Sequence, residues 1–103
     1  MKYTLIKYHF KESSETDWHK EIAQFVEALN TDPDLQGKIS YRVMKARGTP
    51  DYYHLATAVD DEAAKLLQSK EFFVRYTAQN RIVSGGETEA LPLEIIAETS
   101  YRL

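Results

Sequence analysis

Hydrophobic and aromatic residues occupy both faces of the first segment, residues 3–10, which predicts a β-strand covered on both sides. One face holds Tyr3, Leu5, Lys7 and His9, and the other holds Thr4, Ile6, Tyr8 and Phe10.

A helical pattern follows this strand. Apolar residues recur at steps of four, three and four, the spacing of one stripe on an α-helix. They are Trp18, Ile22, Phe25 and Leu29. Ser14 is a suitable N-cap, because its hydroxyl can accept a hydrogen bond from a backbone N–H near the start of the helix. Pro33 cannot continue the helix, so we expect the helix to end before it.

Two further strands, residues 39–47 and 52–59, are separated by a short turn. The turn residues are Gly48, Thr49, Pro50 and Asp51. A Gly/Pro turn between two such segments is typical of a β-hairpin. On the second strand of this hairpin, one face holds Tyr52, His54, Ala56 and Ala58.

A second helical region and a last strand complete the pattern. Asp60, Asp61 and Glu62 supply the negative charge that a helix N-terminus favours. Ser69 is a candidate cap for a second stretch of this helix. After the Gly-rich residues 84–86, residues 91–101 alternate and predict a long final strand.

The order β-α-β-β-α-β is the ferredoxin-like α+β arrangement, in which helices cover one face of an antiparallel sheet. No repeat or linker divides the chain, so we interpret residues 1–103 as one domain. We expect the other face of the sheet to be too apolar for contact with water. Its predicted apolar residues are Leu5, Met44, Tyr52 and Ile96. A second copy of the sheet would cover this face, so we expect a homodimer.

Composition and charge exclude several function classes. The 103 residues include 16 acidic and 13 basic ones, a formal charge of −3. This charge disfavours nucleic-acid and anionic-membrane partners, which need a positive excess. There is no cysteine, which excludes disulfides and thiolate chemistry. The first segment resembles neither a signal peptide nor a membrane span, so we expect a cytoplasmic protein.

The chain resembles the antibiotic-biosynthesis monooxygenase-like family of dimeric α/β barrels in GKISYRVMKARGTPDYYHLATAVDDEAAKLLQSKEFFVRYTAQNRIVSGG and LPLEIIAETS. The resemblance rests on Gly37 four residues before Tyr41, the short hairpin, the acidic helix start and the spacing from Ser69 to Phe72. It implies a barrel of two four-stranded sheets from two subunits, with the helices outside and a cavity in each subunit.

For the enzymes of this family, the resemblance implies a cavity that binds a polycyclic phenol, a quinol or haem. It implies oxygenation without flavin or a dedicated metal, in which the substrate anion supplies an electron to dioxygen and the protein supplies a base and a dry pocket. We therefore expect no cofactor.

The chain departs from the family pattern at two places. Ala56 and Ala58 stand where the third strand often has Glu and Trp, and Leu66, Leu67 and Gln68 stand where the second helix often has His. Both departures weaken the quinol-oxygenase and haem-degrading interpretations. Haem degradation is weakened more, since it loses its iron ligand.

His54 is the best candidate for a catalytic base. An imidazole with a pKa of about 6.5 can accept a phenolic proton at neutral pH. Ala56 and Ala58 on the same face leave room for a ligand. Tyr52 and Arg42 are the candidates that orient the ring and the oxygen of the substrate. The alternative for His54 is a hydrogen-bonded position in the dimer interface.

Lys7 and His9 are further substrate-binding candidates on one face of the first strand. A lysine there would lower the pKa of a bound phenol by Coulomb attraction. The alternative is an ordinary surface cation. For Arg42 the alternative is a salt bridge to Glu94 or Glu98 across the sheet.

Other chemistries lack a motif. His9, His19 and His54 have no metal-site spacing, no Ser lies in a GxSxG elbow, and Ser84-Gly85-Gly86 is not a phosphate loop.

Two function classes remain. One is a cofactor-independent monooxygenase acting on a small aromatic, quinol or polyketide-like substrate, favoured by a deep cavity bounded by His54 and Tyr52. The other is a non-catalytic or stress-response barrel that binds a small hydrophobic or aromatic molecule, favoured by an interior filled with Tyr and Phe.

Overall fold

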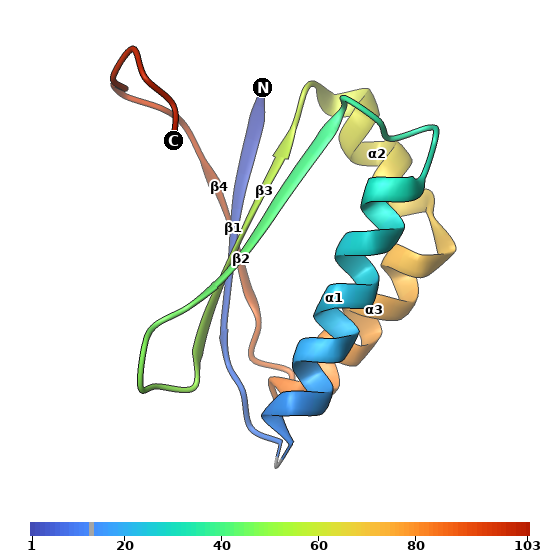
Figure 1. Ribbon diagram of the computed structural model, residues 1–103, viewed down its shortest axis with the longest axis vertical. Coiled ribbons are helices and arrows are strands. Elements are labelled where there is room, and N and C mark those ends of the chain that lie inside the picture. The colour runs from blue at the N-terminus through green and yellow to red at the C-terminus, as the bar shows by residue number, and fades with distance from the viewer. Residues whose placement is uncertain (13) are drawn as a thin grey trace.

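Four strands and three helices make up the computed structural model, which describes residues 1–12 and 14–103. In chain order they are β1 (Lys2–His9), α1 (Glu15–Thr31), β2 (Ile39–Lys45), β3 (Asp51–Ala58), α2 (Asp61–Ser69), α3 (Glu71–Val83) and β4 (Glu89–Leu93). The strands form one antiparallel sheet in the order β2-β3-β1-β4. All three helices cover the same face of this sheet (Figure 1). The predicted ferredoxin-like α+β fold is confirmed, with the second helical region divided into α2 and α3.

The first helix has the cap and the apolar stripe that the sequence predicts. Ser14 Oγ accepts a hydrogen bond of 3.3 Å from the backbone N–H of Asp17. At the start of α2, Asp60 accepts one of 2.8 Å from Ala63 in the same way. The stripe of α1 is buried in the core through Trp18, Ile22, Phe25 and Leu29.

The break between α2 and α3 lies at Lys70, and Ser69 does not cap α3 as predicted. The Ser69 hydroxyl donates to the carbonyl of Leu66 in its own helix. Lys70 precedes α3 and gives it no side-chain cap. Its ammonium instead lies 3.1 Å from Asp32 and 2.6 Å from Asp34, and so ties this break to the end of α1.

The face of the sheet away from the helices, which we call the open face, is strongly apolar at its centre. Leu5 pairs with Leu55 on one side and Leu91 on the other, so three leucines lie in one row. Met44 and Leu93 on this face are each 44% exposed. An apolar patch of this kind marks an interaction surface.

Two residues predicted for the open face lie elsewhere. Tyr52 is 1% exposed and lies on the helix-covered face. Successive side chains of a strand point to opposite faces, and Tyr52 is an odd number of positions from Leu55, which lies on the open face. Ile96 lies beyond β4 and is 86% exposed.

The last strand is shorter than the predicted 91–101. β4 pairs with β1 alone, and the last residue pair is Leu93 with Tyr3. Since β1 begins at Lys2, residues beyond Leu93 have no strand of this chain left to pair with. Residues 94–103 leave the sheet and extend away from it (Figure 1). In the described residues, no helix is long and apolar enough to cross a membrane.

Candidate functional site

His54 is fully buried at the centre of three tyrosine hydroxyls. The hydroxyl of Tyr8 lies 2.8 Å from Nε2, and the hydroxyls of Tyr41 and Tyr76 lie 2.9 Å and 3.2 Å from Nδ1. A neutral imidazole has one donor nitrogen and one acceptor nitrogen. In either tautomer, the nitrogen without a hydrogen can accept a hydrogen bond from a tyrosine hydroxyl, and along that hydrogen bond it can take up a proton.

The sheet register brings these groups together. β3 lies between β1 and β2. Tyr8 on β1 stands opposite Tyr52, and Tyr41 on β2 stands opposite Ala56. Tyr52 and Ala56 are the neighbours of His54 on the same face of β3. Tyr8 and Tyr41 are therefore diagonal to His54 across the sheet, a distance that an aromatic side chain can span. The third hydroxyl comes from α3, which packs on this face.

Stacked aromatic rings hold the hydroxyls in place. Trp18 Nε1 donates a hydrogen bond of 2.9 Å to the Tyr8 oxygen. The Trp18 ring stacks on Tyr76 with a centroid distance of 5.6 Å and an interplanar angle of 6°. Phe25 also stacks on Tyr76, with centroids 3.9 Å apart. Rings restrained in this way keep the tyrosine oxygens directed at one imidazole.

The cluster is uncharged at neutral pH. Burial lowers the pKa of His54 to about 4, because the charged imidazolium is poorly solvated there. Burial also raises the pKa of Tyr8, Tyr41 and Tyr76 well above the usual value. His54 is thus a neutral base that needs a nearby anion in order to become protonated.

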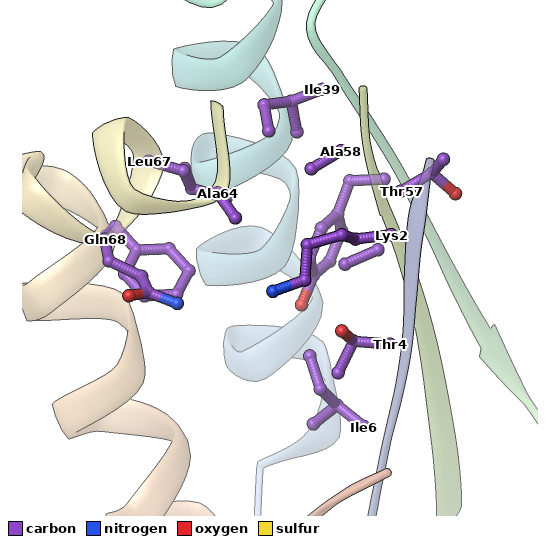
Figure 2. A pocket seen from close by; sticks show the side chains of 12 residues that line it. Lys2, Thr4, Ile6, Ile39, Thr57, Ala58, Ala64, Leu67 and Gln68 are labelled. Atoms are coloured by element: carbon purple, nitrogen blue, oxygen red, sulfur yellow. The ribbon is translucent and has the colours of Figure 1, made fainter. Parts of the chain in front are cut away.

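Two neighbouring cavities lie between the sheet and the helices. The larger has a volume of about 340 Å³ and includes His54 in its lining. Its other lining residues are Thr4, Ile6, Tyr41, Gln68, Phe73, Tyr76, Thr77, Asn80, Arg81, Thr88 and Ala90. The smaller, of about 140 Å³, lies between the sheet and α2 (Figure 2). The two share Tyr41 and four other lining residues, so they lie side by side.

Asn80 adds a polar donor at the larger cavity. It is 5% exposed, and its Oδ1 accepts a hydrogen bond of 2.7 Å from Thr88 Oγ1. Its Nδ2 has no hydrogen-bond partner within the part of the chain that the structure describes. A buried N–H without a partner is unfavourable by roughly 1–3 kcal/mol. Asn80 therefore places a buried amide donor beside the Tyr8 hydroxyl.

Comparison with known proteins identifies the fold. No model of a known protein family matches the chain, and no curated protein matches it. Among solved structures, SnoaB, a cofactor-independent oxygenase from Streptomyces nogalater, matches with a TM-score of 0.74 and 13% identity over 97% of this chain and 98% of that one. An antibiotic biosynthesis monooxygenase matches with a TM-score of 0.76 and 12% identity over 94% and 100%.

This chain has the fold of the antibiotic biosynthesis monooxygenases. A dimeric ferredoxin-like protein of unknown function from Jannaschia sp. CCS1 also matches, with a TM-score of 0.65 and 16% identity over 92% of this chain and 100% of that one. The resemblance predicted from the sequence is confirmed at the level of the fold. The antibiotic biosynthesis monooxygenase fold is thus shared by an oxygenase and by a protein of unknown function, so the fold alone does not determine the function.

Tyr52 shares the face of His54, as predicted, but lines neither of the two cavities. Its hydroxyl donates to Glu15 over 2.9 Å and lies 2.7 Å from Nε2 of His19. Lys45 lies 2.9 Å from the same Glu15 oxygen and lowers the pKa of that carboxyl. Tyr52 therefore joins the hairpin to the start of α1.

The other three predicted substrate-binding residues lie on the open face, away from His54. Lys7 pairs with Glu89 at 3.5 Å, and His9 contacts Asp51. Arg42 is exposed on β2. The alternative salt bridge from Arg42 to Glu94 or Glu98 is ruled out within this chain, because β2 and β4 are the opposite edges of the sheet.

Sequence reasoning missed the groups that surround His54. Tyr8 and Tyr41 do lie on strand faces that it recognised as apolar, and alternation alone places them beside the His54 position once the strands are aligned. Tyr76 and Asn80 gave no signal, because they reach the site only through the docking of α3.

Proposed function

We propose that this chain is a cofactor-independent monooxygenase whose substrate is a small aromatic, quinol or polyketide-like molecule bound in the larger cavity. The observation that carries this proposal is the buried, neutral His54, whose Nδ1 is connected to the cavity by the hydroxyls of Tyr41 and Tyr76. The fold, shared with a cofactor-independent oxygenase, supports it.

The first step is removal of a proton from a phenol or enol of the substrate. The substrate hydroxyl gives its proton to the Tyr41 oxygen while Tyr41 gives its own to Nδ1 of His54. This requires the tautomer in which Nε2–H donates to the Tyr8 oxygen. With a pKa of about 4, protonating His54 at pH 7 is unfavourable by roughly 4 kcal/mol. The attraction between the imidazolium and the substrate anion formed beside it offsets this cost.

Oxygenation then uses the electrons of the substrate anion. The anion transfers one electron to dioxygen, and the substrate radical combines with superoxide to form a carbon–oxygen bond. The His54 imidazolium returns its proton to the resulting peroxide, and loss of water leaves a carbonyl group. The chain contributes the base, the orientation and the exclusion of water.

We further propose that the working unit is a homodimer. The row of Leu5, Leu55 and Leu91 on the open face would pack against the same row of a second copy. Two-fold pairing of identical surfaces is the commonest way to cover such a face. One protein of similar fold is a dimeric ferredoxin-like protein, which supports this assembly.

Oxygen uptake tests the oxygenase proposal. The purified protein, with no added flavin or metal, should consume oxygen with 1,8-dihydroxynaphthalene or anthrone. A positioned base contributes about 10²–10⁴-fold, so His54→Ala should lower turnover by that factor. His54→Gln keeps a polar side chain in the buried site and serves if the alanine variant unfolds. His19→Gln, at an exposed histidine outside both cavities, is the matched control and should retain full turnover.

The second candidate is a non-catalytic barrel that binds a small hydrophobic or aromatic molecule. It is favoured by the tyrosine hydroxyls on both nitrogens of His54, which would also satisfy a purely structural histidine. Binding of 2-naphthol without oxygen uptake from any of these phenols would select this candidate.

A further inference from the structure

The hydrogen bonds of Tyr8 decide which nitrogen of His54 carries the imidazole hydrogen. The Tyr8 hydroxyl has one hydrogen to donate and two lone pairs with which to accept. Trp18 Nε1 is a donor only, so it occupies one of these lone pairs, at 2.9 Å. The contact of 2.8 Å between Tyr8 and Nε2 of His54 can run in either direction. If Tyr8 donates, the hydrogen of the neutral imidazole lies on Nδ1. If Nε2–H donates, Nδ1 is free to accept from Tyr41.

The second arrangement needs another acceptor for the Tyr8 hydrogen. Asn80 lies beside the Tyr8 hydroxyl and can supply one through its amide oxygen. Without such an acceptor the Tyr8 hydrogen would be unpaired in the core, which is unfavourable. Tyr8 would then donate to Nε2, and Nδ1 of His54 would hold a hydrogen and could not take up a proton. The base on the cavity side therefore depends on the direction of the Asn80 amide.

The contacts on the other side of Asn80 favour an amide oxygen directed at Tyr8. With Oδ1 at Thr88, the Nδ2 beside Tyr8 makes no hydrogen bond within the described residues. A half-turn of the amide exchanges its oxygen and nitrogen, and the hydrogen-bond network decides between the two positions. After the half-turn, Nδ2 donates to Thr88 at the 2.7 Å contact, and Thr88 donates to Ser84 at 2.8 Å. Ser84 in turn donates to the carbonyl of Arg81 at 3.3 Å. Each hydroxyl then uses its single hydrogen once.

We propose that Asn80 is a positioning residue, whose amide oxygen accepts the hydrogen of Tyr8 and so holds the hydrogen of His54 on Nε2. Nδ1 is then the acceptor that faces Tyr41 and the larger cavity. The inference rests on the base assigned in the proposed function. It explains how that base is kept in its working tautomer.

NMR of the imidazole nitrogens tests this inference without a substrate. In protein labelled with ¹⁵N-histidine, a ring nitrogen with a hydrogen and one without resonate in well-separated ranges. Couplings to the ring hydrogens distinguish Nδ1 from Nε2. His54→Gln assigns the signals, because those of His54 disappear in that variant. At pH 8, where the imidazole is neutral, the parent should show the hydrogen on Nε2 and none on Nδ1.

Two variants should move this hydrogen. Asn80→Leu removes the acceptor at similar volume and should shift the hydrogen of His54 to Nδ1. Tyr8→Phe should do the same, because it removes the hydroxyl to which Nε2–H donates and leaves Tyr41 as the acceptor. Asn30→Leu, the same change at an exposed position of α1, should leave the hydrogen on Nε2. Asn80→Leu should also lower kcat for oxygen uptake about 10–100-fold, because the base has to change tautomer first.

The outcomes separate this inference from the oxygenase proposal. A parent with the hydrogen on Nδ1 overturns the role of Asn80, and so does an Asn80→Leu variant that keeps Nε2–H. Oxygen uptake that depends on His54 would keep the oxygenase in both cases. The expected spectra without oxygen uptake from any phenol would keep the role of Asn80 and remove the oxygenase. If Asn80→Leu does not fold, the parent spectrum and Tyr8→Phe carry the test, and Nε2–H in Tyr8→Phe overturns the inference.

Discussion

The hydroxyl oxygen of Tyr41 lies 2.9 Å from Nδ1 of His54, and Tyr41 lines both cavities. His54 itself has no exposed surface in the chain. A proton that leaves a ligand for His54 therefore has to pass through a hydroxyl, and Tyr41 lies where the two cavities adjoin.

Replacing Tyr41 by Phe should interrupt this path while keeping the ring that packs on Phe25. We expect kcat for oxygen uptake to fall about 10–100-fold with little change in KM, because the hydroxyl acts in proton transfer and not in burial of the ligand. Tyr53→Phe removes a hydroxyl from the open face and should leave kcat unchanged. A Tyr41→Phe variant with parental kcat would direct the proton path to Tyr76.

The buried His54 should make the stability of the protein depend on pH. Its pKa is about 4 in the folded chain and about 6.5 when unfolded, so the unfolded state binds more protons between these values. The free energy of unfolding should be highest above pH 6.5 and should fall as the pH decreases toward 4. The contribution of this one group at pH 5 is a loss of roughly 2 kcal/mol relative to pH 8.

Urea unfolding at pH 8 and pH 5, at one protein concentration, measures this dependence. His54→Gln removes the titrating group and should lose about that much of the difference between the two pH values. His19→Gln, at an exposed histidine, is the comparison for general effects of histidine removal. An equal pH dependence in parent and His54→Gln would show that His54 is not held neutral.

Local patterns predicted those parts of the molecule that depend on neighbours in sequence. The cap at Ser14 depends on the three residues that follow it. The shared face of His54, Ala56 and Ala58 depends on the two-residue period of a strand. The sequence therefore identified the candidate base and the alanines that line a cavity beside it.

Parts that depend on long-range contacts were not predicted. Tyr76 reaches His54 from 22 positions away, through the docking of α3 on the sheet. The end of β4 is set by the start of β1 and not by the alternation of residues 91–101. Lys7 and Arg42 were grouped with His54 by residue type, whereas their positions on the strands direct them to the opposite face.

The open face should mediate the dimer. Sedimentation at micromolar concentration should give about twice the chain mass of 11.9 kDa. Leu55→Glu introduces a charge into the centre of the leucine row and should give a monomer that keeps its helical signal, because the substituted side chain lies away from the core. Val74→Glu changes a residue of α3 that is 56% exposed, and should remain dimeric. A parent protein that sediments at 11.9 kDa would contradict the assembly.

The C-terminal segment should add to the same interface. Residues 94–103 pair with no strand in the described part of the chain, and two of their large side chains, Ile96 and Tyr101, are 86% and 87% exposed. We expect a second subunit to cover them, with Tyr101 in contact with that subunit. Truncation after Ala97 should then weaken the dimer at least about tenfold, since burying one large aromatic side chain contributes roughly 1.5–3 kcal/mol.

The dissociation constant from sedimentation measures this change, and Tyr101→Ala should reproduce most of it. Arg102→Ala removes only an exposed ion pair with Glu98 and should have little effect. If the truncated chain dimerises as tightly as the parent, the segment lies outside the interface and the leucine row alone holds the subunits together.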